Sequence, residues 1–251
     1  MKFLSRRSPV ISTSGMLAAS QPLAVSSGLR LLEQGGNAAD AAVAVAAALN
    51  VTEPTSTGLG GDCFALYFSA DTGSITALNG SGRLPAALDL QRVQREGFGM
   101  GLPARHPYTI TVPGACAGWC DLLERHGSFQ LSEVLSPAIQ LAEAGFPVTP
   151  ITSYFWRRGA EEVLSVALGG SELTIDGRGP QPGQVFRNPG LARALRRVAE
   201  GGKAAFYQGE IAADIAHTIQ KAGGCLSEAD LASHTSTWDQ PLWVDYHGIR
   251  L

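Results

Sequence analysis

The spacing of apolar residues predicts two consecutive helices near the start of the chain. A first amphipathic segment begins around Ser20, and Gly35–Gly36 ends it. Asn37, with Asp40 three positions later, resembles a helix-capping pair. The run Ala41–Leu49 that follows is apolar nearly all round. We therefore expect a buried second helix whose small side chains allow close packing against a sheet.

A change from helical spacing to short apolar runs predicts a β-hairpin in the first third of the chain. Phe64–Phe68 has the length of a strand, Asp71–Gly73 offers a turn, and Ile75–Leu78 returns. The glycine-rich stretch Gly58–Gly61 directly precedes this hairpin.

The remainder of the chain alternates helical spacing with glycine stops. The sequence predicts helices over Gly114–His126, from a Ser136–Pro137 cap to Ala144, from Asn188–Pro189 to Gly201–Gly202, and along the stripe Ile211, Ile215 and Ile219 up to Gly223. The last third is therefore expected to be largely helical.

The sequence predicts a β-hairpin at the end of the chain. Leu242–Tyr246 is typical of a strand, His247–Gly248 of its turn, and Ile249–Leu251 of the opening of a partner strand. A domain rarely ends in this way, so we expect the chain to be a piece of a longer protein. The competing interpretation is a frayed terminus.

Composition restricts the class of protein. With 251 residues, 45% hydrophobic and 16% charged, the chain can bury a core. The net charge of −3, without a dense Lys/Arg block, argues against a nucleic-acid partner. Ala41–Leu49 is much shorter than the about 20 apolar residues of a membrane span, so no membrane association is expected. No signal-like apolar segment follows Met1–Pro9, which predicts a cytoplasmic location.

A search for familiar catalytic motifs assigns no catalytic residue. The sequence contains no nucleophile elbow, Walker loop, His-Glu-x-x-His motif or paired Cys-x-x-Cys. Its five histidines are scattered singly. Cys116 and Cys120 lie one helical turn apart, and we interpret them as small buried helix residues.

Two glycine-rich loops are candidates for ligand binding. Gly58–Asp62 could wrap a phosphate with backbone amides, but it precedes a strand, so the sequence favours a tight turn with close backbone packing. Asn79–Pro85 follows a strand and presents Arg83, a residue suited to gripping a carboxylate. The alternative for Arg83 is a side chain tied to a neighbouring acid or carbonyl.

Several blocks occur together and in a fixed order. They are Gly35–Ala44, Glu53–Gly61, Val112–Gly114, Gly145–Val148, Ala205–Gly209, Asp230–Leu231 and Pro241–Tyr246. In sequence and order they closely resemble the N-terminal part of the large subunit of the gamma-glutamyltransferase (gamma-glutamyltranspeptidase) family, and the resemblance covers nearly the whole chain.

The resemblance implies an α+β fold, namely the αββα sandwich of N-terminal-nucleophile hydrolases. Residues 1–251 would form a single incomplete domain of a precursor that cuts itself into two subunits. It also implies that the nucleophile is a threonine at the head of the small subunit, with its own α-amine as base. The partners would be that small subunit and a small gamma-glutamyl or other amide substrate. No metal or organic cofactor is expected.

One position departs from the family pattern. Typical members carry a substrate-binding arginine four residues before the proline of the Asn79–Pro85 loop, and Ser81 occupies that position here. Arg83 lies only two residues before Pro85. Ser81 and Arg83 are therefore the candidate substrate-binding residues, and an acylase-like preference for a non-glutamyl acyl group is the alternative to glutathione hydrolysis.

Other interpretations remain open at the level of sequence. Ser233–Thr237 contains a His-Thr pair, but its order and position differ from the small-subunit head, so we interpret it as an ordinary polar loop. The chain could also be a catalytically silent binding module or the product of a truncated gene. A nucleotide-binding protein built on Gly58–Gly61 is a weaker third hypothesis, and it predicts stabilisation by phosphate.

Overall fold

The computed structural model describes residues 8–99 and 101–251. The α-helices are α1 (Pro22–Glu33), α2 (Ala38–Thr52), α3 (Leu90–Arg95), α4 (Ala115–His126), α5 (Leu131–Ala144), α6 (Pro150–Gly159), α7 (Pro189–Tyr207), α8 (Glu210–Lys221) and α9 (Glu228–Ala232). Three shorter helical segments are η1 (Pro107–Thr109), the π-helical η2 (Ala160–Leu164) and η3 (Gly170–Leu173).

The strands form one three-stranded and two small antiparallel sheets. They are β1 (Cys63–Ser69), β2 (Ser74–Gly80), β3 (Phe146–Pro147), β4 (Val185–Phe186), β5 (Thr237–Asp239), β6 (Asp245–Tyr246) and β7 (Ile249–Arg250). The larger sheet has the order β1-β2-β5, whereas β3 pairs with β4 and β6 with β7. The predicted central hairpin is confirmed.

The helical layer is built around α2. This helix packs against α1, α4 and α5, and its alanine face is almost entirely buried. Close approach to α1 depends on Gly28, where an added Cβ would lie 2.9 Å from the Ala41 carbonyl oxygen. The predicted buried, small-residue helix is therefore confirmed, although it continues past Leu49 to Thr52 and packs mainly against other helices instead of a sheet.

Asp40 joins the start of α2 to the loop after α4. Its carboxylate accepts hydrogen bonds from the backbone amides of Asn37, Ser128 and Phe129 and from the Ser128 hydroxyl. The predicted Asn37–Asp40 capping box is present, and the Asp40 side chain is fully buried. A capping residue thus also stabilises a tertiary contact between distant segments.

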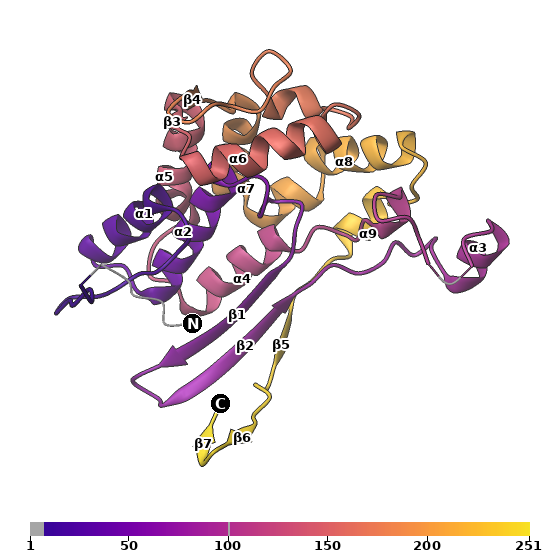
Figure 1. The fold of residues 1–251 in the computed structure, drawn as a ribbon. Coiled ribbons are helices and arrows are strands. Elements are labelled where there is room, and N and C mark those ends of the chain that lie inside the picture. Colours follow the sequence, from indigo (N-terminus) through magenta and orange to yellow (C-terminus); the bar gives the residue numbers. More distant parts are fainter. Residues whose placement is uncertain (1–7, 100) are drawn as a thin grey trace.

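The β1-β2 hairpin packs on the helices through one face only (Figure 1). Along β1 half-buried and exposed side chains alternate, as expected for a strand with one covered face. Ala65 and Tyr67 pack against the core, while Phe64, Leu66 and Phe68 are 68%, 73% and 61% exposed. We call these three side chains the open apolar face.

The predicted start of one helix is wrong. Ser136–Pro137 does not cap a helix, because α5 already begins at Leu131 and Pro137 lies inside it. Gln130 and Glu133 form a capping box that starts the helix earlier. The proline is buried on the α5 face that packs on the core, so burial offsets the helix bond that proline cannot donate.

The expected strand at Leu242–Tyr246 is only partly formed. β6 covers Asp245–Tyr246, and the turn at His247–Gly248 has positive φ at both residues. Val244 and Leu251 exchange backbone hydrogen bonds that continue this ladder. Leu242 makes no such pair among the described residues, and its side chain is 97% exposed.

Among the described residues, no helix combines the length and the apolar character that crossing a membrane requires. Within the same residues, no three His, Cys, Asp or Glu side chains cluster closely enough to hold a metal ion.

Replacing Asp40 with alanine should lower the free energy of unfolding by about 3 kcal/mol or more, because it removes a charged acceptor and leaves several partly buried donors without a partner. Urea denaturation measures the change. Asp214→Ala, at an exposed position of α8, is the control and should change stability by less than about 0.5 kcal/mol. Equal effects of the two substitutions would contradict this role of Asp40.

Candidate functional site

The glycine-rich loop before β1 is held by the first amides of α4. Gly61 accepts hydrogen bonds on its carbonyl oxygen from Gly114 N at 2.9 Å and from Ala115 N at 2.8 Å. The first amides of a helix have no partner inside the helix, so this carbonyl satisfies two of them. The sequence interpretation of Gly58–Asp62 as a turn with close backbone packing is consistent with this geometry.

The end of β2 and the start of α4 approach each other more closely than any side chain would allow. A Cβ on Gly114 would lie 1.8 Å from the Gly80 carbonyl oxygen, and one on Gly80 would lie 2.7 Å from the Cys63 carbonyl oxygen. Glycine is required at these positions for lack of space, not for its φ angle, which is −104° at Gly114.

We call the contact between Gly61, Gly80 and Gly114 the junction. The predicted substrate-binding loop follows β2 directly beside it. Asp62 accepts a hydrogen bond from Gly82 N at 2.9 Å, and the Arg83 carbonyl oxygen accepts one from Val112 N, also at 2.9 Å. Ser81 N donates to the Asn79 side chain at 3.0 Å. The backbone on both sides of the Arg83 side chain is therefore fixed by neighbouring segments.

The two candidate residues differ in exposure. Ser81 is half-buried, whereas Arg83 is exposed. Within residues 8–99 and 101–251, no carboxylate lies within ion-pair distance of the Arg83 guanidinium. The alternative in which Arg83 is tied to a neighbouring acid has no support in this part of the chain.

Tyr207 hydrogen-bonds to the segment that enters α4. Its hydroxyl donates to the Pro113 carbonyl oxygen at 2.7 Å and accepts from Ala117 N at 3.0 Å, which fixes the turn that enters α4. Burial raises the pKa of the Tyr207 phenol well above its usual range, so the phenol remains a hydrogen-bond donor. The sequence placed Tyr207 in a family block but gave no sign of this contact.

His234 stacks on Tyr207, with ring centroids 5.3 Å apart. The predicted loop is present over residues 233–236, but His234 is only 9% exposed and Thr237 begins β5, so the segment is not entirely a polar surface loop. Burial lowers the pKa of His234, and the positive charge of Arg83 lowers it further. His234 is therefore neutral at physiological pH.

The cysteine closest to the site is unsuited to nucleophilic attack. Burial raises the pKa of Cys63, the first residue of β1, to about 11, so its thiol stays protonated at neutral pH. Cys116 is buried on α4 and Cys120 half-buried, in agreement with their interpretation as helix-packing residues.

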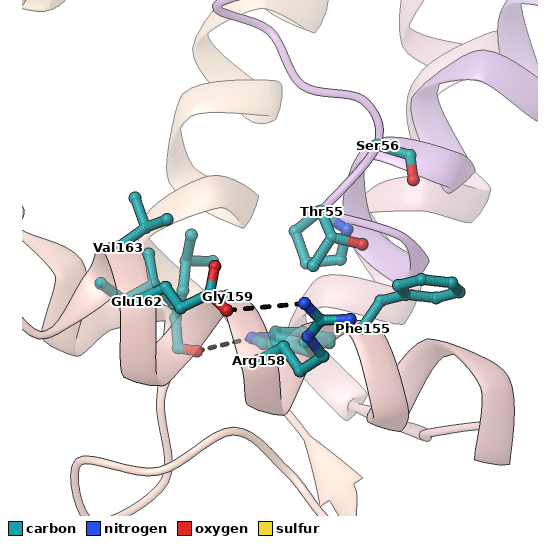
Figure 2. Close-up of a pocket in the computed structure, with 11 residues that line it drawn as sticks. Thr55, Ser56, Phe155, Arg158, Gly159, Glu162 and Val163 are labelled. Atoms are coloured by element: carbon teal, nitrogen blue, oxygen red, sulfur yellow. Dashed lines mark hydrogen bonds and ion pairs between the residues drawn. The ribbon is translucent and has the colours of Figure 1, made fainter. Parts of the chain in front are cut away.

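A cavity of about 570 Å³ lies apart from this junction. Its walls come from the loop after α2 and from α6 and η2, as seen in Figure 2. Neither Ser81 nor Arg83 lines it. The structure thus brings the two predicted residues together on one loop beside Asp62, and it separates them from this cavity.

Alanine substitutions at Gly82 and Gly60 should differ in their effect on stability. A Cβ at Gly82 would lie 1.7 Å from the Val112 carbonyl oxygen, whereas one at Gly60 would meet no atom within 4 Å. Gly82→Ala should therefore lower the free energy of unfolding by at least about 2 kcal/mol, and Gly60→Ala should change it by no more than about 0.5 kcal/mol. Urea denaturation distinguishes them, and a tolerated Gly82→Ala would show that the loop is not held as described.

Comparison with known proteins extends these observations. Glutathione hydrolase-like YwrD proenzyme of Bacillus subtilis (strain 168) is 37% identical over 243 residues, which cover 96% of this chain and 46% of the relative. Cephalosporin acylase from Bacillus halodurans superposes with a TM-score of 0.87 at 38% identity, covering 100% of this chain and 49% of that one. Gamma-glutamyltranspeptidase of Helicobacter pylori gives a TM-score of 0.86 at 30% identity, with coverages of 97% and 70%.

This chain spans about half the length of the curated relatives that it matches, as the 46% coverage shows. The solved relatives confirm the α+β fold of the N-terminal-nucleophile hydrolase type. A family model described as Gamma-glutamyltranspeptidase matches residues 24–251. The chain therefore belongs to the gamma-glutamyltranspeptidase family, in which it corresponds to the N-terminal part of the large subunit.

Proposed function

We propose that the chain is part of an amide hydrolase or acyltransferase whose nucleophile is a threonine outside residues 1–251. Family membership supports this reaction class, and the name of the Bacillus subtilis relative describes a proenzyme. The role of the chain is then to shape the acyl-binding side of the site and to carry the fold on which the nucleophile is mounted.

In the proposed reaction, the threonine hydroxyl attacks the amide carbonyl while its own α-amine takes up the hydroxyl proton. Backbone amides stabilise the resulting oxyanion, as is general in acyl transfer. The tetrahedral intermediate expels the amine, which leaves with the proton, and an ester to the threonine remains. Water or an acceptor amine then attacks this ester and releases the acid or the new amide.

Within this function, the Ser81–Arg83 loop selects the acyl group. The observation that carries the proposal is the exposed Arg83 guanidinium, which has no carboxylate partner among the described residues and sits on a backbone fixed at Gly82 and Arg83. Because the backbone is already fixed, binding of a carboxylate has to order the Arg83 side chain but not the loop that carries it.

Ser81 favours an acyl group different from that of the typical family member. It stands at the position of the expected glutamyl-binding arginine, and it is half-buried and short. A carboxylate bound by Arg83 would lie at a different place from one bound by an arginine at position 81. An acylase-like substrate, with a carboxylate but without the glutamyl α-amine, is the form of the proposal that we favour over glutathione.

In this proposal, the small subunit binds to the open apolar face of the hairpin. Phe64, Leu66 and Phe68 are exposed and alternate along β1 with Ala65 and Tyr67, which pack against the helical core. Burial of such side chains stabilises a fold by about 1.5–3 kcal/mol each. The occupant of this face in the proposal is the second sheet of the αββα sandwich, supplied by the small subunit.

The test uses the product of the complete reading frame and three anilide substrates. Gamma-glutamyl anilide carries an α-carboxylate and an α-amine, glutaryl anilide carries only the carboxylate, and butyryl anilide carries neither. Arg83→Ala should lower kcat/KM for glutaryl anilide by about 10- to 100-fold, the scale of one charged hydrogen-bonded pair, and leave butyryl anilide within about twofold. Ser81→Arg should shift the preference toward gamma-glutamyl anilide.

Arg95→Ala, at an exposed residue of α3, is the matched control and should leave all three rates unchanged. An equal loss on glutaryl and butyryl anilide would assign Arg83 a structural role instead of carboxylate binding. A full product that stays uncut and inert on every substrate would contradict the enzymatic function itself.

A further inference from the structure

The cavity of about 570 Å³ has the composition of a small-molecule site. Thr55 and Ser56 lie on one side, in the loop after α2, while Phe155, Arg158 and Glu162 come from α6 and η2 on the other. Pockets for small ligands have volumes of about 300–1,000 Å³ and combine an apolar lining with a few convergent polar groups.

The floor of the cavity is rigid. Trp156 is fully buried, and its indole N–H donates to the Leu173 carbonyl oxygen at 2.8 Å. Gly159 keeps the opening clear, since a Cβ there would meet only the Thr55 methyl group, at 3.9 Å. The wall continues into the π-helical turn Ala160–Leu164, a rare geometry that occurs frequently at functional sites.

Arg158 and Glu162 line the cavity, and a second cation, Arg105, lies close to Glu162. Figure 2 shows the Arg158 guanidinium and the Glu162 carboxylate facing each other, with Nη2 and Oε1 3.7 Å apart. This distance is too long for a direct hydrogen bond, so both groups keep capacity for a ligand. Their side chains are 59% and 55% exposed.

Neighbouring side chains orient the two charges. Tyr154 lies under Arg158, with the guanidinium carbon 5.9 Å from the ring centroid. Arg105 approaches Glu162 from the other side, with Nη2 and Oε2 3.9 Å apart, and its Nη1 donates to the Glu162 carbonyl oxygen at 2.8 Å. The carboxylate is therefore positioned independently of Arg158.

We propose that this cavity binds a free amino acid with a large apolar side chain. The α-carboxylate pairs with Arg158, the α-ammonium group pairs with Glu162, and the side chain packs on the exposed ring of Phe155. An acid without an amine would leave Glu162 without a new partner, and an amine without an acid would meet repulsion from Arg158 and from the nearby Arg105. A zwitterion satisfies both charges at once.

The site is distinct from the Ser81–Arg83 loop but connected to it through the chain. Thr55 and Ser56 lead directly into Gly58–Asp62, the segment whose last residue holds Gly82. A ligand in the cavity would therefore contact the residues just before that segment without entering the proposed acyl site. The proposal does not depend on the reaction that the enzyme catalyses.

Isothermal titration of the whole expressed protein with L-phenylalanine tests the proposal. Three analogues each lack one feature: 3-phenylpropionate has no ammonium group, phenethylamine has no carboxylate, and glycine has no side chain. L-phenylalanine should bind saturably, and each analogue should bind at least about tenfold more weakly. This series needs no variant and so is independent of any effect of mutation on folding.

Two variants assign the charges. Arg158→Met and Glu162→Gln should each weaken L-phenylalanine binding by about two- to fivefold, as expected for a partly exposed charge pair. Arg193→Met and Glu228→Gln, at exposed positions on α7 and α9, are the matched controls and should have no effect. Equal binding of L-phenylalanine and phenethylamine would overturn the proposal, as would unchanged binding by both charge variants or no saturable binding up to about 10 mM.

Discussion

The structure depends on the contact in which the Gly61 carbonyl oxygen receives the first two amides of α4. The end of β2 can lie directly against this helix start because Gly114 has no side chain, while Gly80 has to be glycine because it lies against the Cys63 carbonyl oxygen of β1. The contact locks the hairpin to the helical layer at one end. The Ser81–Arg83 loop leaves the hairpin at that same end and takes its position from it.

Much of the local structure could be predicted from the sequence. The Asn37–Asp40 cap and the β1-β2 hairpin carry strong local signals, because each depends on residues within a few positions of one another. The loop after β2 was likewise predictable from its glycines, whereas the substrate-binding role of Ser81 and Arg83 stays a proposal. Pro137 misled the prediction, because burial in the core outweighed the local preference of proline for a helix start.

The rest of the site could not be predicted, since it is made by contacts between distant segments. Asp62 holds Gly82, and Tyr207 holds the turn at Pro113, across separations that no local pattern records. His234 looked like part of a polar loop because its burial comes from stacking on Tyr207. The cavity beside α6 depends on the π-helical turn, for which the sequence gives no recognisable signal.

The most direct test of the junction is amide hydrogen exchange measured by NMR on the protein. Four backbone amides donate hydrogen bonds at or beside this contact, namely those of Gly82, Val112, Gly114 and Ala115. The account predicts that all four are protected from exchange and become exposed in one common opening event. The amide of Gly60, which makes no backbone hydrogen bond in the described structure, should exchange rapidly. Rapid exchange at Gly82 and Val112, with protection only within α4, would show that the Ser81–Arg83 loop is not positioned by this contact.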